Sequence, residues 1–155
     1  MKLNVLTIIL LAFVSISCKQ ELMKVVLPDN VSSETENYIQ SHEYMIVLCL
    51  DASDCSPCLL NLWKPYKRVM EKRKTGILLV ILNSDEETIT NTLKNMNVTF
   101  NFIIDKESTF KTNNEVFKFA KDKAFVIDRN KNVVFPDSPI KNEKNWTKVL
   151  KIVSN

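Results

Sequence analysis

The chain has 155 residues, 45% of them hydrophobic, and its 21 basic and 18 acidic residues give a net charge of +3. This length and apolar content predict one globular domain, and the interspersed charges do not favour nucleic-acid binding. A single glycine, Gly76, excludes glycine-rich phosphate loops, and a single histidine, His42, excludes histidine-rich metal sites.

The N-terminus has the pattern of an export signal. Lys2 is followed by an almost uninterrupted apolar stretch from Val5 to Val14, then small residues and Cys18. The stretch is shorter than the roughly 20 apolar residues of a membrane-spanning helix, and its order is typical of a secretory signal. With Ser17 directly before Cys18, it resembles a bacterial lipoprotein signal. The alternative is an N-terminal membrane anchor with an incidental cysteine.

The resemblance to a lipoprotein implies that Cys18 becomes the acylated first residue of the mature chain. We therefore expect a signal peptide over 1–17, a polar tether over 18–33 and a folded domain over 34–155. Lipid would hold the domain at the membrane in the cell envelope, on the extracytoplasmic side. Lys19 stands where aspartate signals retention at the inner membrane, so the resemblance favours the outer membrane in a Gram-negative cell.

The first half of the domain reads as alternating helices and strands. Ser33 and Glu36 form a possible capping box for a helix that ends at Ser41. The apolar run Tyr44–Leu50 predicts a strand buried on both faces. A helix kinked by Pro65 should follow Cys58 and end near Gly76, since glycine suits a helix C-terminus. Ile77–Leu82 then predicts a second buried strand.

The second half continues the alternation and closes with a hairpin. Acidic residues after Ser84 indicate a helix start, with Ile89, Leu93 and Met96 as its apolar stripe. The remaining expected elements are a strand over Phe100–Ile104, a helix or irregular segment over Glu107–Phe119, a hairpin of Ala124–Asp128 and Asn132–Phe135, and a helix with Trp146, Val149, Leu150 and Val153 on its apolar face. This order predicts an α/β fold with a central mixed sheet, parallel in its first half, and helices on both faces.

The reactive chemistry is expected at Cys55 and Cys58, two cysteines three apart between a buried strand and a helix. At a helix N-terminus the dipole and backbone N–H groups lower a thiol pKa from about 8.5 to roughly 3.5–7.5. The resulting thiolate attacks disulfides. Cys55 is the candidate nucleophile, and Cys58 would resolve the mixed disulfide. Pro57 stiffens the turn between them.

The buried strand, the Cys-Ser-Pro-Cys segment and the later hairpin together resemble thioredoxin-like proteins. The resemblance is to the envelope-anchored thiol–disulfide oxidoreductases of the TlpA and ResA kind, and it covers Glu36 to the C-terminus. It implies a thioredoxin-like fold, a redox-active Cys55–Cys58 disulfide and no cofactor or metal. The implied partners are protein thiols or disulfides and an upstream thiol donor or acceptor.

Three residues depart from the pattern of that family. Asp54 replaces the tryptophan that often precedes the first cysteine, and its negative charge opposes formation of the thiolate. Cys49 stands where many members bury an acidic residue, and we expect it to pack as a small core residue. Asp122 stands where the family has a cis-proline that shapes the substrate groove.

Other readings of the cysteines stay open. A permanent disulfide on a non-catalytic binding or scaffolding lipoprotein would also suit an oxidising compartment. A zinc site would need Cys49 and His42 as its further ligands. A thiol peroxidase is a third alternative, although the residues before Cys55 lack the proline and threonine of the peroxiredoxin motif.

Overall fold

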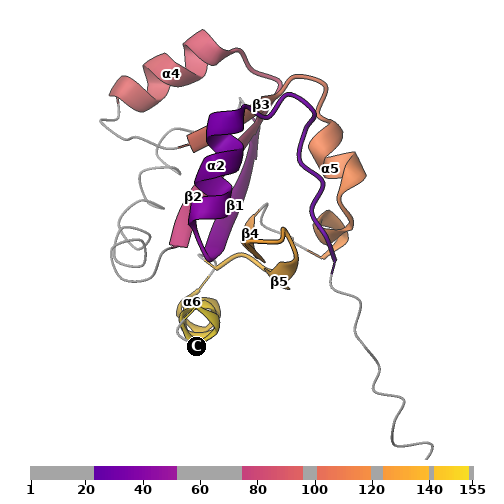
Figure 1. The fold of residues 1–155 in the computed structure, drawn as a ribbon, viewed down its shortest axis with the longest axis vertical. Helices are drawn as coiled ribbons and strands as arrows, with labels where there is room; N and C mark the ends of the chain where they lie inside the picture. The colour runs from indigo at the N-terminus through magenta and orange to yellow at the C-terminus, as the bar shows by residue number, and fades with distance from the viewer. Residues whose placement is uncertain (1–22, 52–74, 96–100, 120–123, 140–141, 154–155) are drawn as a thin grey trace, which may run out of the picture.

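The computed structural model describes residues 23–51, 75–95, 101–119, 124–139 and 142–153. Figure 1 shows the elements within these ranges. In chain order they are α2 (Ser33–Ser41), β1 (Tyr44–Asp51), β2 (Thr75–Leu82), α4 (Glu86–Asn95), β3 (Asn101–Asp105), α5 (Thr109–Asn113), the 3-10 helix η1 (Glu115–Lys118), β4 (Ala124–Asp128), β5 (Val133–Phe135) and α6 (Glu143–Ile152).

The five strands form one mixed sheet in the order β3-β2-β1-β4-β5. β1 pairs in parallel with β2, which pairs in parallel with β3, whereas β4 runs antiparallel to β1 and to β5. The parallel first half and the closing hairpin are therefore as the sequence predicted. β1 lies in the middle of the sheet, with a neighbour on each side.

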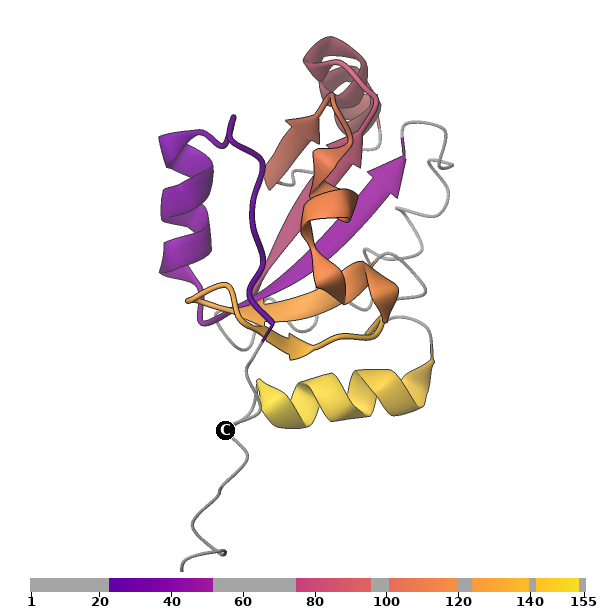
Figure 2. The ribbon, with the colours of Figure 1, turned by 90° about the vertical axis from the view of Figure 1, so that its right-hand side faces the viewer.

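Two apolar clusters fill the two faces of the sheet. One face packs against α2, α5 and η1 through Ile39, Phe110 and Val116. The opposite face packs against α4 and α6 through Leu93 and Val149. Figure 2 shows α2 and α5 over one side of the strands and α6 below β5. This arrangement confirms the expected sheet with helices on both faces.

The two central strands form because almost every side chain they carry is apolar and buried. All eight residues of β2 are buried, as are Met45–Cys49 of β1. A strand covered on both faces needs such a continuous apolar run rather than an alternating one. Within the described ranges, no helix has the length and hydropathy needed to cross a membrane.

The expected role of Gly76 as a helix C-terminus is wrong, because this glycine lies in β2 opposite Met45 of β1. A Cβ atom at Gly76 would lie 2.8 Å from Met45 Cε and 3.0 Å from the hydroxyl oxygen of Tyr38. That hydroxyl accepts a hydrogen bond from the backbone N–H of Ile77 at 3.2 Å. The missing side chain therefore makes room for α2 to approach the sheet closely.

The start of α2 also differs from the expected capping box by one residue. The N-cap is Ser32, whose Oγ accepts a hydrogen bond from the backbone N–H of Thr35 at 3.1 Å. Glu36 does not close the cap. Its carboxylate instead accepts from Lys131 Nζ at 2.6 Å, which joins α2 to the β4–β5 turn.

Residues 23–32, which fall within the expected tether, pack on the domain, and we call this segment the strap. Its backbone pairs with the β4–β5 hairpin, because Val25 N donates to Lys131 O at 2.8 Å and Val133 N donates to Met23 O at 2.7 Å. The Val25 side chain is buried in the cluster below α2 and α5. Figure 2 shows the strap running from β5 towards the start of α2.

One buried asparagine fixes the middle of the strap. Asn114 Oδ1 accepts from Val26 N at 2.7 Å, and its Nδ2 donates to Val26 O at 2.8 Å and to Phe110 O at 2.7 Å. The side chain is therefore bonded to both the strap and α5.

We expect Asn114→Ala to lower the free energy of unfolding by about 2–3 kcal/mol, because it removes three hydrogen bonds at a buried site. Urea unfolding of the variant measures this loss. Asn113→Ala, at the exposed last position of α5, is the control and should change stability by less than about 0.5 kcal/mol. A loss in Asn114→Ala no greater than that of the control would contradict this role.

Candidate functional site

The residues that the sequence singles out for chemistry, Cys55 and Cys58, lie outside the described residues, as do Cys18, Asp54 and Asp122. The structure does describe the strands that lead to two of these segments. β1 ends at Asp51, four residues before Cys55, and β4 begins at Ala124, two residues after Asp122.

Both segments join the sheet at the same edge. In the pairing registers Asp51 of β1 lies opposite Leu82 of β2, and Leu82 lies opposite Asp105 of β3. Ala124, the first residue of the antiparallel β4, pairs with Leu48 near the same end of β1. We call this edge the carboxyl edge, and in α/β sheets it is where functional groups are usually found.

Cys49 is a core residue, as the sequence predicted. It lies in β1 opposite Val80 and is fully buried in the cluster beneath α2 and α5. The position where the resembling family carries an acidic group therefore holds a small apolar side chain, so a buried carboxylate cannot relay protons to the thiols from here.

His42 lies too far from Cys49 to share a zinc ion with it. His42 caps the C-terminus of α2 and precedes the first residue of β1, whereas Cys49 is near the other end of that strand. Seven residues of extended chain span about 23 Å, and both zinc ligands must lie within about 2.3 Å of the metal. His42 Nδ1 instead lies 2.8 Å from the carbonyl oxygen of Tyr38.

The carboxyl edge carries aspartates that the sequence reasoning did not single out. Asp51 ends β1, Asp105 ends β3, and Asp85 follows β2 by three residues. The signal for them was an aspartate at or just after each apolar strand run. Asp105 is buried, and its carboxylate accepts hydrogen bonds from Phe110 N at 2.7 Å and Thr109 Oγ1 at 3.3 Å. It therefore accepts a backbone N–H of the first turn of α5, because the side chain of the N-cap residue Ser108 forms no capping hydrogen bond.

Two residues with positive φ hold the turns at this edge together. Asn83 after β2 and Ser108 before α5 both have φ of 55°. Ser108 Oγ donates to Asn83 Oδ1 at 2.8 Å, and Asn83 N donates to Asp105 O at 3.3 Å. Asparagine is one of the few residues other than glycine that adopt this backbone region, and both bonds join residues more than 20 apart in the sequence. The ends of β2 and β3 are thus fixed relative to each other.

Asp85 begins α4 and bonds twice to Thr88. Its Oδ1 accepts from Thr88 N and its Oδ2 from Thr88 Oγ1, both at 2.8 Å. The bond from the Thr88 backbone, followed by the one from its hydroxyl, lowers the pKa of the Asp85 carboxyl from its ordinary value. The charged form is therefore the one that caps the helix.

Replacing Asp85 with alanine should increase hydrogen exchange in the first turn of α4 and leave α6 unchanged. In the unmodified chain the cap stabilises α4 at any pH above the ordinary carboxyl pKa. It is lost as the pH falls through the lowered value, because protonation removes the carboxylate. Exchange rates of the Thr88 amide measured from neutral to acidic pH test both statements. Equal rates in the variant and the parent at neutral pH would show that the cap is unimportant.

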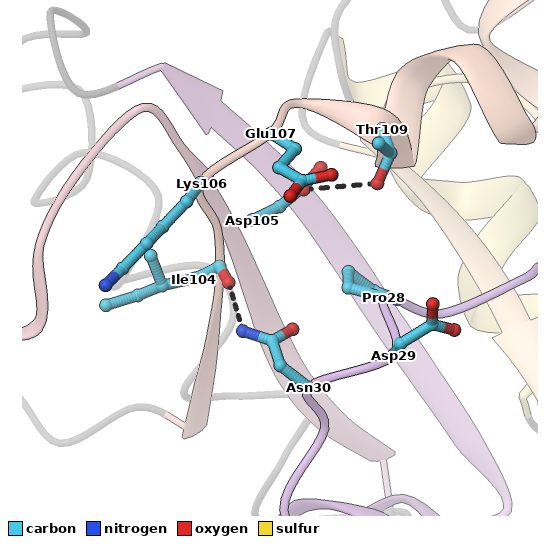
Figure 3. Close-up of a pocket in the computed structure, with 8 residues that line it drawn as sticks. All are labelled: Pro28, Asp29, Asn30, Ile104, Asp105, Lys106, Glu107 and Thr109. Carbon is cyan, nitrogen blue, oxygen red and sulfur yellow. Dashed lines mark hydrogen bonds between the residues drawn. The ribbon is translucent and has the colours of Figure 1, made fainter.

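A shallow hollow lies beside this edge, between the strap and the turn after β3 (Figure 3). Pro28 and Asp29 line one side, and Lys106 and Glu107 line the other. Asn30 crosses it by donating from Nδ2 to Ile104 O at 2.7 Å. The buried carboxylate in its wall, Asp105, already caps α5. The hydrogen bond from Asn30 to Ile104 therefore fixes the strap to the edge strand β3.

No protein-family model matches the sequence, and no curated protein sequence is significantly similar to it. Solved structures do match. The thioredoxin domain of a thiol-disulfide oxidoreductase from Bacteroides vulgatus superposes with a TM-score of 0.55 and 17% sequence identity, over 85% of this chain and 92% of that one.

Two further solved structures give the same result. A thiol:disulfide interchange protein from a Bacteroides species matches with a TM-score of 0.55 and 17% identity, over 86% of both chains. A thioredoxin-like protein from Porphyromonas gingivalis matches with a TM-score of 0.54 and 16% identity, over 72% of this chain and 76% of that one. At such low identity the likeness concerns the fold. The chain therefore has the thioredoxin-like fold, in agreement with the resemblance seen in its sequence.

Proposed function

We propose that this protein is a thiol–disulfide oxidoreductase of the cell envelope, with Cys55 as nucleophile and Cys58 as resolving thiol. One observation carries the proposal. The strand β1 occupies the centre of a thioredoxin-like sheet, and the Cys-x-x-Cys segment follows its carboxyl end after three residues. Solved proteins that share the fold are named as oxidoreductases of this kind.

The reaction needs the two thiols and a partner disulfide. The Cys55 thiolate attacks one sulfur of a client disulfide, and the client's other sulfur leaves as a thiolate. Cys58 then loses its proton and attacks the Cys55 sulfur of the mixed disulfide, which releases the second client thiolate. Two electrons have passed to the client, and the chain now carries the Cys55–Cys58 disulfide. An upstream thiol donor restores the dithiol, and the reverse sequence oxidises a client.

The location rests on the sequence before the strap. Cys18 would carry lipid and hold the domain at the membrane on the extracytoplasmic side, at the outer membrane in a Gram-negative cell. Proteins in an oxidising envelope form disulfides, which a dithiol–disulfide oxidoreductase can reduce or exchange.

A second candidate, a non-catalytic lipoprotein with a permanent Cys55–Cys58 disulfide, is favoured by the charge of the carboxyl edge. Asp51 ends the strand that leads to the cysteines, and Asp54 directly precedes Cys55. Negative charges raise the pKa of a nearby thiol and oppose the thiolate that exchange requires. On this reading the fold serves as a binding module.

Trapping a reaction intermediate tests the proposal. In Cys58→Ser the resolving thiol is missing, so Cys55 should remain joined to client proteins as a mixed disulfide that a reductant releases. The double variant Cys55→Ser/Cys58→Ser is the matched control and should capture nothing. Equal capture by both variants, or capture by neither when they are mixed with a disulfide-containing substrate protein, would contradict the enzyme reading.

A further inference from the structure

Helix α6 presents a stripe of lysines to solvent. Lys144, Lys148 and Lys151 are exposed and follow one another at helical spacing, whereas Asn145 and Val149 are buried. Residues four and three apart share a face of a helix. Within the described part of the chain, no ion pair joins these lysines to a carboxylate.

The same end of the molecule carries further basic groups and the beginning of the strap. Lys24 is an exposed strap residue, and Arg129 is exposed in the β4–β5 turn. In Figures 1 and 2, α6 and β5 form the lower end of the domain, and the strap begins there. Glu43, which precedes β1, and Glu143, the first residue of α6, are exposed carboxylates. We call the group Lys24, Arg129, Lys144, Lys148 and Lys151 the basic end.

The opposite end is acidic on balance, because its exposed carboxylates outnumber the exposed Lys94 of α4 and Lys106 of the turn after β3. α4 begins with Asp85, Glu86 and Glu87, which are exposed, and Glu107 is exposed in the turn after β3. In both views α4 lies at the top of the domain, far from α6. The described surface is thus electrically polar, with its negative end on the side of the carboxyl edge.

The chain between Cys18 and the strap is short, which limits how far the start of the strap can lie from a lipid on Cys18. Four residues, and hence five Cα–Cα steps, separate Cys18 from Met23, the first described residue, which is hydrogen-bonded to β5. Fully extended, they span at most about 18 Å. A lipid on Cys18 would therefore hold Met23, which directly precedes Lys24 of the basic end, within about this distance of the bilayer.

We propose that the basic end binds an anionic lipid surface, with α6 lying on the headgroups and the carboxyl edge directed away from the membrane. This rests on the proposed lipid anchor at Cys18. Lysines within a Debye length of anionic lipid are attracted to it, and the acidic end is repelled. The two forces act in the same sense, so the anchored domain has one favoured orientation. Client proteins would then reach the carboxyl edge from the side opposite the membrane.

Hydrogen exchange of the intact, membrane-extracted chain in vesicles tests the orientation. The vesicles contain either phosphatidylcholine alone or phosphatidylcholine with phosphatidylglycerol, and the mass of the chain reports lipid on Cys18. We expect slower deuterium uptake across 143–152 in the anionic vesicles only, with the difference removed by high salt. Uptake across 86–95 should be the same in both.

Two matched triple variants assign the effect to the lysines. Lys144→Gln/Lys148→Gln/Lys151→Gln should lose the protection of α6 in anionic vesicles. Lys94→Gln/Lys106→Gln/Lys111→Gln changes the net charge equally at other elements and should retain it. Equal uptake across 143–152 in the two vesicle types overturns the proposal, as does equal loss in the two variants. The outcome is separate from redox activity, because Cys55→Ser should show the same α6 protection as the parent chain.

Discussion

Replacing Cys55 with serine is expected to reduce the rate of disulfide exchange to that of the uncatalysed reaction. A serine hydroxyl does not ionise near neutral pH, so the thiolate that attacks the substrate disulfide is lost. Cys58→Ser should allow the first attack but not its resolution, so turnover stops at the mixed disulfide. Reduction of a disulfide-containing substrate protein by a thiol donor, with and without the chain, measures these rates.

Cys49 provides the control for that experiment. It is the cysteine nearest in sequence to the pair, yet the structure buries it in the core below α2 and α5. Cys49→Ala should therefore keep the exchange rate of the parent and show only a modest loss of stability, of about 1 kcal/mol. If Cys49→Ala lost activity and Cys55→Ser kept it, Cys55 would not be the nucleophile.

Replacing Phe110 with alanine is expected to cause the largest loss of stability, about 3–5 kcal/mol. Phe110 is 1% exposed, and its ring centroid lies 5.5 Å from that of Phe117 and 6.5 Å from that of Phe125. Removing the ring leaves a cavity between α5 and the centre of the sheet. A loss of this size approaches the whole stability of a small domain, so the variant should be partly unfolded at 37 °C.

The control for Phe110 lies nine residues further along. Phe119 is 60% exposed, so Phe119→Ala removes the same side chain without creating a buried cavity. It should change the free energy of unfolding by less than about 0.5 kcal/mol. Thermal and urea unfolding of both variants measure the difference. Similar losses in the two would show that Phe110 does not anchor α5 as its packing indicates.

The strands could be predicted because their hydrophobic runs admit few alternatives. The run that begins at Tyr44 gave β1 to within one residue, and the hairpin formed as expected because a polar turn separates two apolar segments. Gly76 was misplaced because a glycine after a charged stretch has the same local signature at a helix end and in a tightly packed strand. What decides between them is the side chain of Met45, which is 31 residues away in sequence.

The strap could not be predicted for a similar reason. Residues 23–32 look like a linker because Pro28 and the serine pair that begins at Ser32 are typical of one, although half of the residues are apolar. They pack on the domain through Asn114 and through backbone bonds to the hairpin, which are long-range contacts without a local signature. Asp51 and Asp105 of the carboxyl edge were missed because each one, taken alone, reads as the ordinary polar end of a strand, whereas Asp85 belongs to the helix start that was expected after Ser84. The pairing of the strands is what brings them together.

Redox titration of the intact chain, with alkylation and mass analysis of each thiol, tests whether Cys55 and Cys58 form a reversible redox couple. We expect the two cysteines to lose and regain their thiols together and reversibly, with a tenfold change in the equilibrium for each 30 mV or so, as for a two-electron couple. A pair that stays disulfide-bonded at potentials below about −300 mV, as structural disulfides do, or a pair that never forms a disulfide, would show that the chain does not exchange disulfides through Cys55 and Cys58.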